Sequence, residues 1–293
     1  MAFWYVFVPI SGGFFNRYRW RKFRNHFNDM RLRPLLDYRQ YRQLEEEAVF
    51  RFTGNIESIT DGHTLWVRGE DLTIPVSLLK TKCYLLPKHE GEGLPEAPEQ
   101  IRWNRVSTLT EGSKVFIGGM IKKQDNRYNF IQSKENPLMV IFYSCPDAEL
   151  PGSVIRSART HNEYWNNITP ASIGIGALIL IYIAASFLDR PAFRLTVISA
   201  LAACFIPILP IFPPGFIFTS LYRRLTWNAR KLRAEHDLAR FDLLPGATER
   251  LANYFGRRAY SLEILAWVFM ILGVIINLVF IFLILLLFQV ISF

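Results

Sequence analysis

The sequence predicts an integral membrane α-helical bundle of three spans, preceded by a small antiparallel β-barrel that forms an N-terminal soluble domain. Three stretches of the 293-residue chain contain no Asp, Glu, Lys or Arg: Tyr164–Leu188, Leu195–Tyr222 and Ile264–Phe293. A helix needs about 20 apolar residues to cross a bilayer, so each stretch is long enough to span it. Residues 48–144 contain instead short runs of β-branched and aromatic residues separated by turns, which is typical of strands.

The first 16 residues are apolar and aromatic, and Pro9 and Gly12-Gly13 interrupt them. They lack a basic region at the start, so we do not expect a secretory signal. Two interpretations remain open for residues 1–16: an anchor lying in the membrane interface, or a minimal additional span. We favour the interfacial anchor.

Residues 17–47 form a basic arm, which contains nine basic and two acidic residues between Arg17 and Arg42. The following residues 43–150 carry twelve basic and sixteen acidic residues, so the excess positive charge flanks the membrane segments. We expect the arm to be an amphipathic helix on the membrane, with its aromatic residues among the arginines. Two alternatives remain open for the arm: it is an ordinary solvated helix with a few packed aromatic residues, or its basic residues only fix the membrane topology. The residues expected at anionic lipid headgroups are Arg17, Arg19, Arg21, Lys22, Arg24, Arg223 and Arg224. Nucleic acid is not an expected partner, because the folded module is not basic.

The β module is predicted over residues 48–150. Asp61-Gly62 lies between two apolar, β-branched runs, which is a strong hairpin signal. A second hairpin is expected around QDNR (124–127), and a buried final strand over Pro137–Ser144. Residues 88–100, rich in Glu, Pro and Gly, read as a surface excursion. Glycines inside the expected strands favour a small curled barrel.

This region resembles the OB-like modules fused to membrane spans in the NfeD family and in the GIDE domain of membrane-anchored ubiquitin ligases. The resemblance rests on the order FTGNIESI, DGHTLWVRG, LTIPVSL, LTEGSKVFIGGMIKK and PLMVIFYS followed by a span, and it covers about a third of the chain. It implies a non-catalytic interaction module. No RING domain follows the last span, so ligase activity is not implied, and the three spans depart from both families.

The membrane half divides into a linker and three spans with one long loop. The expected ranges are 151–169 for the linker, 170–188, 195–222 and 264–293 for the spans, and 223–262 for a basic helical loop. Positive residues concentrate in cytoplasmic loops, so the loop and the soluble domain are placed in the cytoplasm and the C-terminus outside. We expect a multi-pass protein of a bacterial inner membrane.

The second span is predicted to be broken by Pro207, Pro210, Pro213, Pro214 and Gly215. Each proline removes a backbone donor and clashes with the preceding turn. Broken helices occur at transport sites, but no ionisable residue accompanies these prolines. We therefore favour a kinked helix or a hairpin that ends at the cytoplasmic interface. Gly174, Gly176 and Asn277 are expected to serve helix packing, the glycines by permitting close approach and Asn277 by an interhelical hydrogen bond.

Catalytic signatures are missing from the sequence. It contains no HExxH, no GxSxG and no GxxxxGK[ST], and its three cysteines have no CxxC spacing. We expect no catalytic, cofactor-binding or metal-binding residues. The leading hypothesis is a non-enzymatic membrane scaffold or accessory subunit, whose β module binds a protein partner and whose helices pack in a membrane complex. The alternative is a transporter or lipid-handling subunit that uses the broken span, and a membrane hydrolase is the least supported.

Overall fold

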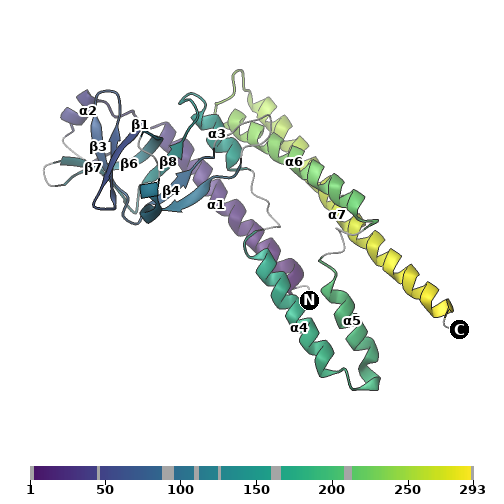
Figure 1. Cartoon of the computed structure of the whole chain (residues 1–293). Coiled ribbons are helices and arrows are strands. Elements are labelled where there is room, and N and C mark those ends of the chain that lie inside the picture. Colours follow the sequence, from purple (N-terminus) through teal and green to yellow (C-terminus); the bar gives the residue numbers. More distant parts are fainter. Residues whose placement is uncertain are drawn as a thin grey trace. The chain divides into compact units, whose positions relative to one another are not determined.

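The structure is a computed structural model that describes residues 3–44, 47–87, 96–108, 112–124, 127–159, 166–207 and 213–291. The chain forms two compact units (Figure 1). The barrel unit comprises residues 20–160, and the helical unit comprises residues 1–19 and 161–293. Helix α1 (Val8–Arg31) contributes its first half to the helical unit and its second half to the barrel unit.

Five strands of the barrel unit close into a barrel (Figure 1). They are β1 (Ala48–Thr60), β2 (Thr64–Arg68), β3 (Thr73–Ser77), β6 (Lys114–Gln124) and β7 (Arg127–Ile131). Their order around the ring is β1-β2-β3-β7-β6, and β6 pairs with β1 to close it. Closure is achieved because β1 pairs with β6 through its first part and with β2 through its second. The predicted β-barrel is confirmed.

Three further strands extend the sheet beside β6. The first half of β6 pairs with β8 (Met139–Tyr143), β8 pairs with β4 (Lys82–Leu85), and β4 pairs with β5 (Glu99–Arg102). The pairs β3–β7 and β4–β8 are parallel. The prediction of a purely antiparallel sheet was therefore wrong. Parallel pairing joins strands distant in sequence, which turn signals do not reveal. A 3₁₀ helix, η2 (Trp103–Thr108), follows β5. Strand β5 begins at Glu99, so it overlaps the end of the predicted surface excursion over residues 88–100. Residues 88–95 of that excursion lie outside the described residues.

Large apolar side chains fill the interior of the barrel. In β2, Leu65 and Val67 are fully buried while Thr64 and Arg68 are not, which is the period-two alternation expected of a strand. Phe130 of β7 is fully buried in the same core. The sequence therefore specifies the barrel through alternating apolar residues, as the pattern indicated.

The second half of α1 packs in the barrel unit, through aromatic residues that the sequence analysis assigned to the membrane surface. Trp20, Phe23 and Phe27 are buried, and the Phe27 and Phe116 rings lie 5.3 Å apart between centroids. Residues three and four apart share one face of a helix, so these aromatics form a single apolar stripe. This stripe packs within the barrel unit. Tyr18, which precedes it on α1, is exposed.

Two short helices complete the barrel unit. Helix α2 (Tyr38–Arg42) begins after Asp37, whose Oδ1 accepts a hydrogen bond from the Gln40 N–H at 2.6 Å. A carboxylate at this position satisfies a backbone donor that the first turn leaves open. Helix α3 (Leu150–Ser157) follows β8 and buries Leu150, Val154 and Ile155.

The helical unit contains two antiparallel helix pairs. A π-helical turn, η1 (Phe3–Phe7), and the start of α1 lie beside α4 (Thr169–Ser186), which pairs with α5 (Arg194–Cys204) after a 3₁₀ turn, η3 (Pro191–Phe193). Helix α6 (Phe216–Arg240) pairs with α7 (Glu249–Ile291) (Figure 1).

Two helices among the described residues are long and apolar enough to cross a membrane, α4 and residues 249–280 of α7. The structure therefore does not establish three spans. The second predicted span is divided, since α5 ends at Cys204 and α6 begins at Phe216 and continues into the basic segment. The prolines explain this division, because a proline cannot continue the hydrogen-bond ladder of a helix. The expected helical loop 223–262 consists largely of the end of α6 and the beginning of α7.

Small residues form the seam between α6 and α7. Ala252, Ala259, Ala266 and Gly273 recur at seven-residue spacing on α7, and all four are buried. A seven-residue repeat keeps one face of a helix directed at its partner along its length. An ion pair adds to this seam, with Arg233 Nη2 and Glu263 Oε2 2.6 Å apart. The pair α6–α7 is thus a close-packed helical hairpin.

Candidate functional site

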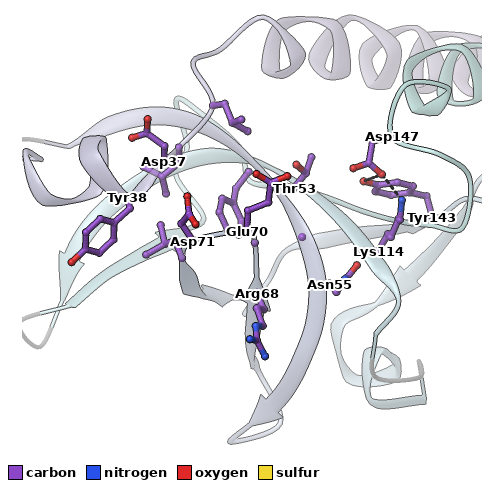
Figure 2. A pocket seen from close by; sticks show the side chains of 16 residues that line it. Asp37, Tyr38, Thr53, Asn55, Arg68, Glu70, Asp71, Lys114, Tyr143 and Asp147 are labelled. Carbon is purple, nitrogen blue, oxygen red and sulfur yellow. Dashed lines mark hydrogen bonds and ion pairs between the residues drawn. The ribbon is translucent and has the colours of Figure 1, made fainter.

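A groove on the surface of the barrel, formed by described residues, is the candidate site. It has a cavity volume of about 340 Å³. Its walls come from the segment before α2, from β1, and from the β2–β3 turn, and Lys114, Tyr143 and Asp147 close one end (Figure 2). All of these residues belong to the barrel unit.

The groove lies where one edge of β1 changes its pairing partner. Arg51 of β1 pairs with the segment before α2, since its N–H donates to Pro34 O at 3.0 Å and its carbonyl accepts from Leu36 N at 2.9 Å. Pairing with β2 on the same edge begins only at Asn55, opposite Arg68. Residues 52–54 therefore form the floor between two different neighbours, and all three line the groove.

Two glycines allow the β2–β3 turn to approach this floor closely. A Cβ at Gly54 would collide with the carbonyl of Arg68, and a Cβ at Gly69 would lie 2.7 Å from Cζ of Phe52. A side chain at either position would push the β2–β3 turn away from β1. Gly54 lies within β1, and its role is this close approach of two backbones.

Carboxylates dominate one side of the groove. Asp37, Glu70 and Asp71 lie there, and Arg68 is directed away from them (Figure 2). Glu70 and Asp71 are exposed on the turn, whereas Asp37 also caps α2. The groove therefore presents acidic groups to whatever enters it from the turn side.

The opposite end of the groove is closed by an internal ion pair. Lys114 Nζ lies 2.7 Å from Asp147 Oδ1, and the Tyr143 hydroxyl donates to the same oxygen at 3.3 Å. Burial raises the pKa of Tyr143, and the charge of Asp147 raises it further, so the phenol stays protonated and remains a donor. Because Lys114 is paired, its charge does not offset the carboxylates across the groove.

These groups suit binding of a chain or a cation-bearing side chain. The backbone of β1 can donate and accept hydrogen bonds, and the carboxylates accept them, most strongly from cationic groups. Within the part of the chain that the structure describes, no cluster of three His, Cys, Asp or Glu side chains could hold a metal ion. Local sequence patterns do not reveal this groove, because its residues come from five separate segments of the chain.

The basic residues predicted to meet lipid fall into two groups. Arg17, Arg21 and Lys22 are exposed on α1, Arg19 is half-buried, and Arg223 and Arg224 are exposed on α6. Arg24 differs, since it is only 4% exposed and its Nη1 donates to the carbonyl of Ala158 at 3.4 Å. It shares a helix face with Trp20 and Phe27, and that spacing is a signal that could have excluded it.

The broken segment is held at its end by α7. Gly215 precedes α6, and its N–H donates to Asn277 Oδ1 at 3.1 Å. Asn277 is 2% exposed, and a Cβ at Gly215 would collide with its side chain. Pro207 lies in the turn after α5, the bond Pro213–Pro214 is cis, and Pro210 lies outside the described residues. The amide of Asn277 thus satisfies a backbone group that the break leaves open.

The two glycines of α4 occupy different environments. A Cβ at Gly176 would lie 2.5 Å from Cε1 of Tyr5, so this glycine permits close packing of the N-terminal segment. Gly174 is exposed, and nothing lies within 4 Å of a Cβ placed there. Only Gly176 is therefore in a packing contact within the described chain.

Comparisons of the chain with protein-family models, with curated proteins and with solved structures find no match in any of the three.

Proposed function

We propose that this chain is a non-enzymatic scaffold or accessory subunit of the membrane, in which the barrel binds a protein partner in the cytoplasm. Helices α4 and α7 insert into a bacterial inner membrane and pack there with other membrane proteins. The observation that carries the proposal is the combination, in one chain, of a binding groove on a closed barrel with two apolar helices that expose large side chains.

The exposed surfaces of α4 and α7 support membrane insertion. Leu178 and Tyr182 on α4, and Ile271 and Val279 on α7, are among the exposed apolar side chains. Helices that expose such residues along their length require lipid or other helices around them. Exposed Arg223 and Arg224 on α6 support a cytoplasmic position for the hydrophilic part of the α6–α7 hairpin by the positive-inside rule.

The topology of the barrel supports an OB-like module. The ring order β1-β2-β3-β7-β6, in which β1 pairs with two strands, is that of a five-stranded barrel with non-sequential closure. OB-folds bind extended ligands across their second and third strands and the loops beside them. The groove lies against β1 and the β2–β3 turn, at the ends of the second and third strands.

The proposed partner segment is an extended chain that carries a lysine or arginine. Such a chain would lie along residues 52–54 of β1 and place its cation among Asp37, Glu70 and Asp71. Carboxylates beside a half-enclosed groove favour a cationic side chain over an anionic one. A protein partner with a basic juxtamembrane segment would supply such a chain.

The test is purification of the tagged full chain in mild detergent, followed by identification of stoichiometric partners. The variant Glu70→Lys/Asp71→Lys reverses two exposed charges of the groove and should reduce recovery of the partner about tenfold. Glu57→Lys is the matched control, because Glu57 is exposed on β1 but does not line the groove. Recovery of a chain without any stoichiometric partner, or equal recovery with the groove variant and the control, would overturn the proposal.

A further inference from the structure

The N-terminal segment of residues 3–16 lies along α4. The Asn166 Nδ2 donates to the carbonyl of Pro9 at 3.0 Å, and the Ser172 hydroxyl donates to the carbonyl of Trp4. Gly176 is the next contact, since Tyr5 lies against it. The contact of Pro9 is with Asn166, just before α4, whereas the contacts of Trp4 and Tyr5 are farther along, within α4. The segment therefore runs antiparallel to α4, a helix that is long and apolar enough to span a membrane.

The inner face of this segment belongs to an apolar cluster of the helices. Tyr5 is buried with Leu180 and Ala184 of α4 and with Val197 and Ala200 of α5. At the other end of the segment, a Cβ at Gly12 would lie 2.7 Å from Oδ1 of Asn166, so the absence of a side chain at Gly12 makes room for the amide of Asn166. The segment is thus packed against α4 from Gly12 to Tyr5.

The outer face consists of large apolar side chains. Phe7 and Phe14 are 62% and 64% exposed, and Phe3, Val6 and Phe15 are also exposed. Residues 3–16 include no charged side chain. An exposed apolar face of this kind requires a non-aqueous neighbour.

The charge pattern identifies that neighbour as lipid. Positive residues begin at Arg17 and continue at Arg19, Arg21 and Lys22, immediately after the last exposed phenylalanine. Acyl chains followed by anionic headgroups match an apolar segment followed by a basic one. A helix lying flat in the interface would turn a polar face to water, but here the face opposite the phenylalanines contacts α4.

We propose that residues 3–16 are inserted across one part of the bilayer beside α4, with Phe7 deeper in the hydrocarbon than Phe14. Fourteen helical residues rise about 21 Å, which is less than the thickness of the hydrocarbon layer of about 30 Å. The segment is therefore a partial span with acyl chains on its outer face and Arg17 at the headgroups. The inference rests on the proposed membrane insertion of α4.

The test measures the depth of single cysteines in proteoliposomes of phosphatidylcholine and phosphatidylglycerol. A Cys83→Ala/Cys145→Ser/Cys204→Ala background carries Phe7→Cys, Phe14→Cys or, as a control on α7, Leu272→Cys. Each is modified with a nitroxide, and oxygen and nickel accessibilities are compared. The site at residue 7 should lie about 10 Å deeper than the site at residue 14, from seven residues of helical rise.

The outcomes separate this inference from the proposed function. Equal depth at residues 7 and 14 means a flat interfacial helix, and water accessibility at both means no insertion; each overturns the inference while residue 272 remains buried in lipid. Water accessibility at residue 272 overturns membrane insertion itself, and the inference with it. A photoreactive benzoylphenylalanine at Phe7 or Phe14, in the chain with its own cysteines, gives a second reading: cross-linking to acyl chains should be stronger at Phe7.

Discussion

The barrel and the α6–α7 hairpin place side chains of opposite kinds in their interiors. In the barrel, the fully buried residues are large and apolar, such as Phe130 and Ile74. In the hairpin, the buried residues of α7 include Ala259, Ala266 and Gly273, while large residues such as Ile271 and Phe282 are exposed.

The difference shows that the two parts are built for different surroundings. Burial of large apolar groups drives folding only where water is the alternative. Where lipid is the alternative, close approach of backbones matters more, and small residues provide it. The following experiments test the packing of the barrel, of the helices, or of both.

The largest expected contrast is in thiol reactivity. Cys83 is fully buried in the barrel core, and burial raises the pKa of its thiol to about 12. At pH 8 its thiolate fraction is on the order of a thousandfold below that of an ordinary cysteine. Cys145 is half-buried, and burial also raises its pKa. A water-soluble maleimide should modify Cys145 first and Cys83 only after the barrel unfolds in urea.

The helical unit provides the comparison for that experiment. The Cys204 Sγ lies 3.4 Å from the carbonyl of Ala200, in an apolar helix. If lipid rather than a folded core protects this thiol, a change from liposomes to detergent should increase its modification while Cys83 remains protected. Modification of Cys83 in the native chain at the rate of Cys145 would show that the barrel core is open.

Truncation of phenylalanine should affect the barrel more than the exposed face of α7. Phe130→Ala leaves a cavity in the barrel core and should reduce the free energy of unfolding by about 3–5 kcal/mol. Phe282→Ala removes a side chain that is exposed on α7 and should have little effect in liposomes. Pulse proteolysis of the full chain across a urea series measures both changes. Equal losses in the two variants would contradict the comparison.

Enlargement of a seam residue should show the reverse sensitivity. Ala266→Leu introduces three carbon atoms between α6 and α7 and should cost about 1–3 kcal/mol. Val268→Leu is the matched control, because Val268 is exposed two residues away on α7. The melting temperature of the full chain in mild detergent should fall for Ala266→Leu alone. A similar decrease in both variants would show that the seam is not the packed face.

The smallest expected effect is the pH dependence from His26. Burial lowers the pKa of this imidazole, and its Nε2 lies 2.8 Å from the carbonyl of Pro137. The unfolded chain therefore binds a proton at a higher pH than the folded chain does. The contribution of His26 to stability is fully present above about pH 6.5 and decreases as the pH falls toward the lower, folded-state pKa.

Urea unfolding of the barrel at pH 7.5 and pH 5 measures this contribution. His26→Gln keeps a side chain that can donate to the Pro137 carbonyl but removes the titration. The stability difference between the two pH values should therefore be smaller in the variant. An unchanged difference would assign the pH dependence to other groups.

Much of the barrel was predictable from local sequence patterns, but the candidate site was not. Alternation in β2 and the Asp61-Gly62 turn are local signals, and they identified strands and a hairpin at the correct positions. The groove depends on Arg51 changing its pairing partner and on Gly54 approaching Arg68, and neither relation has a local signature. Parallel pairing of β3 with β7 is likewise a long-range property.

The helices show the same division between composition and contact. Uncharged length identified α4 and α7, and proline density identified the break before α6. Composition did not distinguish Arg24, which donates to the Ala158 carbonyl, from the exposed Arg21. It also did not distinguish Gly176, which contacts Tyr5, from the exposed Gly174.

The sequence by itself determined which residues form the five strands of the barrel, which helices are apolar enough to span a membrane, and where the chain carries positive charge, because these properties depend on neighbours within a few residues. Only the tertiary structure decided which edge of β1 stays open beside Glu70 and Asp71, which small residues of α7 face α6, and that residues 3–16 lie along α4. Those properties depend on pairing between distant segments, and their energies arise only when the backbones are brought together.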